Sequence, residues 1–155
     1  MFHNETVSGL GFAFDCELSS HDISTPMFAG KTMLTVENSG GVCTIRMDDG
    51  KVNAMDLTFC RMLTDSLRTI EQTDASAVLL TGNHRVFSAG VDLKKLLKLK
   101  DQQRDEFLRA LIECFETAFR FPKPMVAAVN GAAIAGGCAL ALACDLRLLA
   151  RGVKI

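Results

Sequence analysis

Two segments rich in glycine and alanine carry the residues of this chain that could do chemistry. They read FSAGVDL at residues 87–93 and AIAGGCALALACD at residues 133–145. The second continues, after two glycines, as a predicted helix. A helix N-terminus presents unpaired backbone N–H groups, and small residues let a ligand approach them closely. Two such N–H groups converging on one point would form an oxyanion hole, which stabilises negative charge developing on a carbonyl oxygen.

Each segment also has a purely structural explanation. Small residues allow a helix to pack closely against a strand, and turns often need glycine. Short motifs frequently match by chance, so either segment alone favours packing over catalysis. Nearby polar residues have similar explanations. His84 is typical of an exposed loop, and Lys94, Lys95, Lys98 and Lys100 are typical of a solvated surface.

Strands and helices alternate along the part of the chain that must position these segments. Runs rich in β-branched residues at 33–37 and 42–47, joined by NSGG, predict a hairpin. Further strands are predicted at 77–81, 125–129 and 146–150. Helices are predicted after an N-cap at Asp56, at 103–121 and at 136–144. Short links between these elements predict an α/β fold with largely parallel strand pairing.

Composition limits the class of protein. A length of 155 residues suits one domain, and 48% apolar with 23% charged residues excludes wholesale disorder. A formal net charge of −1 and the absence of Trp and Tyr argue against nucleic acid as a partner. Residues 1–32 show no sustained periodicity and lack signal-peptide features, so we expect a poorly structured extension before a domain at 33–155.

The stretch from 124 to 144 has no charged residue and is long enough to cross a bilayer. Its alanines and glycines contribute little insertion energy, and Asn130 interrupts it, so burial in the core is favoured over a membrane anchor. The six cysteines form no CxxC pair, and no histidine lies at metal-ligand spacing. We therefore expect reduced core thiols in a cytoplasmic protein, without membrane attachment or a metal site.

Three ordered segments resemble the crotonase (enoyl-CoA hydratase/isomerase) superfamily over about residues 33–150. KVNAMD at 51–56 resembles the early Asn-Ala-Leu segment of the family. RVFSAGVDLKKL at 85–96 resembles its Phe-Ser/Ala-Ala-Gly-x-Asp loop, and the glycine-rich stretch at 123–150 resembles its Lys-Pro…Gly-Gly…Cys-Asp region. The resemblance implies the N-terminal half of a crotonase-like repeated ββα spiral, because family members extend well beyond the matched part.

The resemblance also implies a function and a site. It implies chemistry on acyl- or enoyl-CoA thioesters, as in fatty acid metabolism, with the backbone N–H groups of Val91 and Gly136 as oxyanion donors. Coenzyme A enters only as part of the substrate, and no metal or redox cofactor is implied. A homotrimer or hexamer is the implied assembly. The residues implied to contact the substrate or its coenzyme A are Asn53, Ala54, Met55, Arg85, Phe87, Ala89, Gly90, Asp92, Leu93 and Gly137.

One position departs from the family pattern. Family hydratases carry a first glutamate three residues after the second donor, where this chain has Ala139, and a methyl group neither takes nor gives a proton. The second family carboxylate would lie beyond Ile155. Isomerisation by the intact protein is therefore favoured over hydration, and the chain alone is expected to be inactive. The alternative is a homologue that only binds coenzyme A esters or only assembles.

Overall fold

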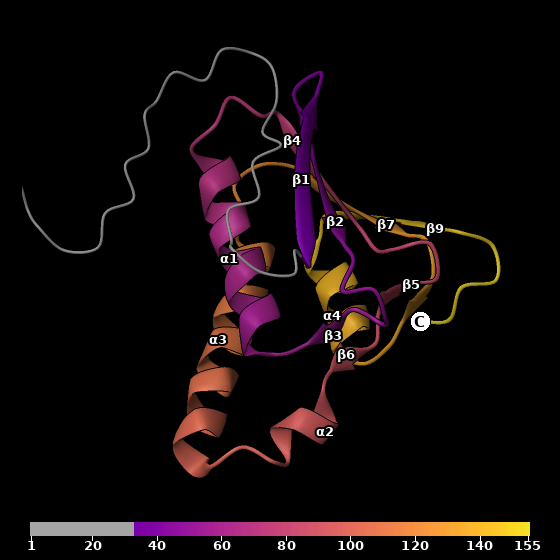
Figure 1. Ribbon diagram of the computed structural model, residues 1–155. Coiled ribbons are helices and arrows are strands. Elements are labelled where there is room, and N and C mark those ends of the chain that lie inside the picture. The colour runs from indigo at the N-terminus through magenta and orange to yellow at the C-terminus, as the bar shows by residue number, and fades with distance from the viewer. Residues whose placement is uncertain (1–32) are drawn as a thin grey trace, which may run out of the picture.

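The computed structural model describes residues 33–155 (Figure 1), so the extension predicted for residues 1–32 lies outside the described part. A five-stranded sheet has the order β1 (Leu34–Ser39), β2 (Val42–Met47), β4 (Ala77–Thr81), β7 (Met125–Val129) and β9 (Leu146–Leu149). The hairpin of β1 and β2 is antiparallel, and the other neighbouring pairs are parallel. The predicted α/β class with largely parallel pairing is confirmed.

Two amphipathic helices, α1 (Leu57–Glu71) and α3 (Asp101–Phe119), pack against each other and lie on one side of this sheet (Figure 1). Asp56 caps α1 as predicted, because its carboxylate accepts a hydrogen bond of 3.0 Å from the Phe59 N–H. The third helix begins and ends two residues earlier than the predicted range of 103–121. Its early end agrees with Pro122, which disfavours helical geometry at the residue before it.

Several short elements lie where the sequence predicted neither a strand nor a helix. Two small parallel sheets pair β3 (Ala54–Met55) with β6 (Gly90–Val91) and β5 (Val86–Ser88) with β8 (Ala132–Ala133). A one-turn helix, α2 (Leu93–Leu96), precedes α3. The helix predicted at 136–144 is present as α4 (Gly136–Ala143), which follows β8. Strands of two or three residues are too short to show a periodic pattern. The two small sheets bring three parts of the chain, residues 54–55, 86–91 and 132–133, to the beginning of α4.

The core lies between the five-stranded sheet and the helices, and its largest fully buried side chains include Ile45, Phe59, Leu63, Leu80, Met125 and Leu140. The uncharged stretch at 124–144 is divided among β7, β8 and α4. Within residues 33–155, no helix is long and apolar enough to cross a membrane. The cysteines of this part are free thiols, buried except for the partly exposed Cys138: Cys43, Cys60, Cys114, Cys138 and Cys144.

Candidate active site

The two glycine segments that the sequence singled out meet in space. At Gly90, where φ is +79°, an added Cβ would lie 2.7 Å from the nitrogen of Gly136 and 2.6 Å from the carbonyl oxygen of Ile134. At Gly136, an added Cβ would lie 3.3 Å from the Gly90 Cα and 3.5 Å from the Val91 nitrogen. The backbones therefore approach so closely that position 90 has no room for a side chain, and the amides of Val91 and Gly136 lie near each other.

Ser88 joins the two segments to each other and to a third part of the chain. Its hydroxyl donates to the carbonyl oxygen of Asn53 over 2.7 Å and accepts from the Gly90 N–H over 3.1 Å. Its own carbonyl oxygen accepts from the Ile134 N–H over 2.9 Å. A Cβ at Gly137 would lie 2.2 Å from that same oxygen, so Gly137 is required for packing. Ser88 is fully buried, and the sequence showed it only as one letter of a motif.

Asn53 fixes the turn before β3 from inside the protein. Its side chain is fully buried, and its φ of +50° is one that asparagine tolerates better than most residues. The side-chain nitrogen lies within hydrogen-bond distance of three carbonyl oxygens, at 2.9 Å from Met47, 3.0 Å from Phe87 and 3.2 Å from Val86. The Asn53 amide therefore holds backbone together, and any contact with a substrate would come from its main chain.

The first residue of α4 offers a polarising N–H group. Gly136 occupies this position, where N–H groups have no intrahelical acceptor and the helix dipole places partial positive charge. Ala135 before it has a φ of +48° and a ψ of −112°, a strained conformation that costs about 1–3 kcal/mol. This conformation turns the chain from β8 into α4, where Gly136 reaches Gly90. No sequence signal marked Ala135, because alanine has no turn preference.

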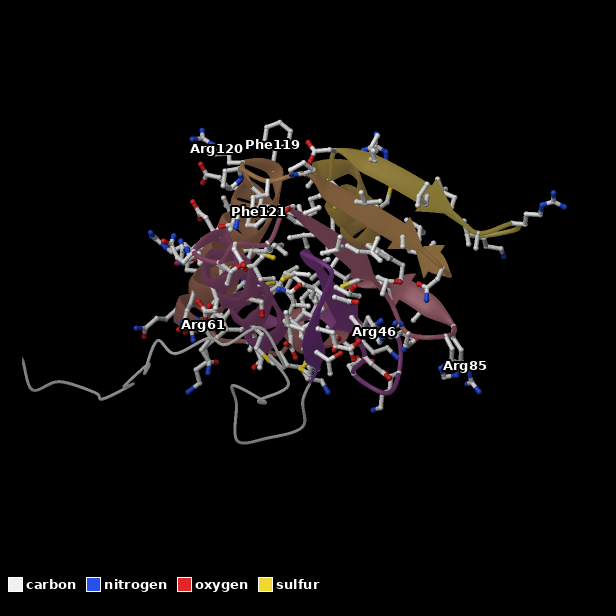
Figure 2. The ribbon with its side chains drawn as sticks, turned by 90° about the horizontal axis from the view of Figure 1, so that it is seen from above. Arg46, Arg61, Arg85, Phe119, Arg120 and Phe121 are labelled. Carbon is white, nitrogen blue, oxygen red and sulfur yellow. The ribbon has the colours of Figure 1, made fainter. Side chains whose placement is uncertain are left out.

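The other predicted contact residues lie around this centre in different environments. Phe87 is fully buried in the core, so its side chain packs and only its backbone is available to a ligand. Ala54 and Ala89 are partly buried, in β3 and directly before β6. Leu93 is 63% exposed at the start of α2. Arg85 is exposed and points outward, on the opposite side of the molecule from α1 and α3 (Figure 2).

A pocket of about 210 Å³ opens beside the pair of β3 and β6, and the sequence did not reveal it. Residues from the beginning of α1, from α2 and its flanks, and from the first half of α3 surround it. Its apolar lining consists of Met55, Leu57, Leu96, Leu99 and Phe107. A mainly apolar pocket next to two neighbouring amides has the character of a small-molecule site.

Charged groups at this pocket are paired. The Lys95 Nζ lies 2.6 Å from Asp56 Oδ2 and 3.8 Å from Asp92 Oδ2. Burial alone would raise the pKa of Asp56, but the hydrogen bonds from Lys95 and from the start of α1 outweigh it, and the pKa lies below its ordinary value. The bond to Asp56 raises the pKa of Lys95. The lowered pKa makes Asp56 a weak base and the raised pKa makes Lys95 a weak acid, so both are poor candidates for proton transfer.

Asp92 has a local structural role. Its Oδ1 accepts from the Lys95 N–H over 3.0 Å and caps α2, while its own N–H donates to the Met55 carbonyl oxygen over 2.9 Å. The carboxylate thus fixes the chain directly after Val91. The prediction that Asp92 also contacts the substrate stays a prediction.

Comparison with known proteins decides the family. The model of the enoyl-CoA hydratase/isomerase family matches residues 37–155, which is most of the chain. The chain belongs to this family. The resemblance of its three ordered segments to the crotonases is thereby confirmed.

Relatives within the enoyl-CoA hydratase/isomerase family include proteins named for both activities. A putative enoyl-CoA hydratase of Thermus thermophilus is 37% identical over 118 residues, covering 74% of this chain and 47% of the relative. The mitochondrial enoyl-CoA delta isomerase 1 of Rattus norvegicus is 30% identical over 130 residues, covering 82% and 45%. The solved structure of Pseudomonas aeruginosa DspI matches with a TM-score of 0.77 at 30% identity, covering 85% of this chain and 54% of that one. The chain therefore has the crotonase fold and spans about half the length of the relatives it matches.

Proposed function

We propose that the amides of Val91 and Gly136 bind the thioester oxygen of an acyl- or enoyl-CoA and stabilise the enolate that forms when the substrate loses a proton next to the carbonyl. The observation that carries this proposal is the contact of the two glycine segments, where a Cβ at Gly90 would lie 2.7 Å from the Gly136 nitrogen. Both donors belong to the backbone, so valine at position 91 is compatible with the role. Preorganised donors of this kind contribute about 10²–10³-fold each to catalysis.

Isomerisation fits the described side chains better than hydration. Ala139 lies one helical turn after Gly136, on the same face of α4, where a family hydratase carries its first glutamate. The carboxylates that line the pocket already form ion pairs: Asp56 and Asp92 with Lys95, and Glu106 with Arg61 at 2.6 Å. Moving a double bond needs only one proton-transfer group, which we assign to the part of the family fold that follows the matched region.

Binding of two matched ligands tests the oxyanion hole. Hexanoyl-CoA carries the thioester oxygen, whereas S-hexyl-CoA has the same chain and no carbonyl. Two hydrogen bonds of about 1 kcal/mol each predict that the chain binds the thioester roughly 10- to 30-fold more tightly in calorimetric titrations. Equal affinities for the two ligands would contradict the proposal.

The lack of a carboxylate at Ala139 favours a second candidate function, a homologue that binds acyl-CoA without turnover. Incubation of the intact protein, rather than of this chain alone, with 3-hexenoyl-CoA and with 2-hexenoyl-CoA separates the candidates. Migration of the double bond supports the isomerase, and binding with neither migration nor hydration supports the non-catalytic protein. Efficient hydration of 2-hexenoyl-CoA would contradict the preference for isomerisation.

A further inference from the structure

Met55 lies between the proposed oxyanion hole and the neighbouring pocket. Its side chain is fully buried, and its Sδ lies 3.1 Å from the point where a Cβ of Gly136 would be. The thioether therefore lies next to the first residue of α4. Met55 is also among the residues that surround the 210 Å³ pocket. One residue thus borders both the two amides and the apolar space beside them.

The backbone on both sides of Met55 is held in place. Met55 pairs with Val91 in the parallel ladder of β3 and β6, and its carbonyl oxygen accepts from the Asp92 N–H over 2.9 Å. Asp56, the next residue, caps α1. The backbone of Met55 therefore has a defined position relative to the Val91 amide, and burial of the side chain limits where its sulfur can lie.

We infer that Met55 limits the width of the acyl chain directly after the carbonyl carbon, so that the site selects unbranched thioesters. The inference rests on the proposed function. With the carbonyl oxygen between the amides of Val91 and Gly136, the next two carbons of the substrate lie against the Met55 thioether. A methyl branch there would overlap the sulfur, whereas a straight chain passes it.

The pocket beyond Met55 suits the rest of such a chain. Its far walls are apolar, with Leu96, Leu99 and Phe107. The volume of about 210 Å³ leaves room for an apolar chain beyond the sulfur. The substrate class is therefore an unbranched acyl-CoA.

Affinities for butanoyl-CoA and 3-methylbutanoyl-CoA test the role of Met55, because these ligands differ by one methyl branch. The wild-type chain is expected to prefer butanoyl-CoA by about tenfold or more, the discrimination that one misplaced carbon produces. Met55→Ala is expected to bring the two affinities within about threefold, by binding the branched ester better. Met55→Leu, which keeps most of the buried volume, is expected to give an intermediate ratio.

Met125→Ala is the matched control. Met125 is also buried, at 1% exposure, but it begins β7 and does not line the pocket. This variant is expected to retain the wild-type ratio, which separates a local effect from general destabilisation. An unchanged ratio in Met55→Ala and Met55→Leu, or a wild type without preference, overturns the inference alone. A wild type that binds neither ester, or that does not distinguish hexanoyl-CoA from S-hexyl-CoA, overturns the proposed function and the inference with it.

Discussion

Gly90 must satisfy two constraints, a left-handed backbone and a contact with no space for a side chain. A residue with a Cβ pays about 1–2 kcal/mol for the left-handed conformation. At Gly90 the new atom would also lie 2.6 Å from the Ile134 oxygen and 2.7 Å from the Gly136 nitrogen, so the two segments must separate. Gly90→Ala is therefore expected to lower the free energy of unfolding by more than the backbone term and to abolish the preference for hexanoyl-CoA over S-hexyl-CoA.

Gly152→Ala provides the control for this substitution. Gly152 has nearly the same φ, +77°, but an added Cβ there meets nothing within 4 Å. In urea denaturation it should show only the backbone cost of about 1–2 kcal/mol, with the ligand preference intact. If the two variants behave alike, contact between the segments does not form the site.

Ala139 offers a test of which reaction the site favours. The residue is exposed on the first turn of α4, so a longer side chain fits there, and a negative charge suits this end of the helix dipole. Positioned acid–base groups contribute about 10²–10⁴-fold. In the intact protein, Ala139→Glu is therefore expected to raise hydration of 2-hexenoyl-CoA at least about tenfold over Ala139→Gln, which matches it in size without a proton-transfer group. Equal hydration rates in the two variants would refute this role for position 139.

Sequence patterns predicted individual residues only where their type was informative. Glycines at 90 and 136 stood out because glycine is typical of tight turns and close backbone contacts. A motif match indicated the backbone N–H of Val91 as a donor. Ser88 and Asn53 act through buried hydrogen bonds to distant backbone, and nothing local reveals those partners. Ala135 owes its strained conformation to the fold around it. Side-chain roles that depend on tertiary contacts were therefore out of reach.

At the scale of elements, length decided what could be predicted. The strands at 77–81 and 125–129 matched the predicted bounds, because each is a compact apolar run between clear turn residues. The pairs β3–β6 and β5–β8 have only two or three residues in each strand, and they form because neighbouring elements bring them together. The pocket is built from four separate elements, so no single segment encodes it.

The beginning of α1 connects helix stability to the rim of the pocket. Asp56 caps α1 and pairs with Lys95, which precedes α3. Asp56→Ala is expected to lower the free energy of unfolding by about 1 kcal/mol near neutral pH through loss of the cap. Asp56→Asn should retain most of the capping and lose the ion pair. Urea denaturation of both variants measures the two contributions separately.

The pH dependence of this pair has a defined sign. The folded-state pKa of Asp56 lies below its ordinary value of 3.8. The ionised carboxylate therefore stabilises the fold fully above pH 3.8, and this stabilisation is lost as the pH falls through the folded-state pKa. The difference in unfolding free energy between wild type and Asp56→Asn should therefore shrink from about pH 6 to about pH 3. Asp101→Asn is a control for a solvent-screened ion pair, because the Asp101 side chain lies 3.4 Å from Arg104 and is 96% exposed. A difference that stays constant over this range would contradict the role of the charge.

At the scale of the whole molecule, the two faces of the five-stranded sheet differ. Side chains alternate along a strand, so Leu146 and Leu148 share a face with their partners Val126 and Ala128, opposite the face that packs on the helices. Leu146 and Leu148 are 62% and 63% exposed on the outermost strand, β9. Parallel sheets are usually covered on both faces, and an apolar edge strand favours association. The relatives extend well beyond the matched region, and this face is open for such additional structure.

Replacing both leucines with lysine tests whether this face drives association of the chain. We expect the wild type to self-associate as its concentration rises, and Leu146→Lys combined with Leu148→Lys to remain monomeric in sedimentation velocity experiments. The free energy of unfolding should change by no more than about 0.5 kcal/mol, since both side chains are largely exposed. Leu97→Lys combined with Ile112→Lys adds the same charge at other exposed positions, 81% and 65%, and should associate like the wild type. A wild type that stays monomeric contradicts the expectation. If the variant with both β9 lysines still forms a discrete trimer or hexamer, the assembly interface lies on another face of the molecule.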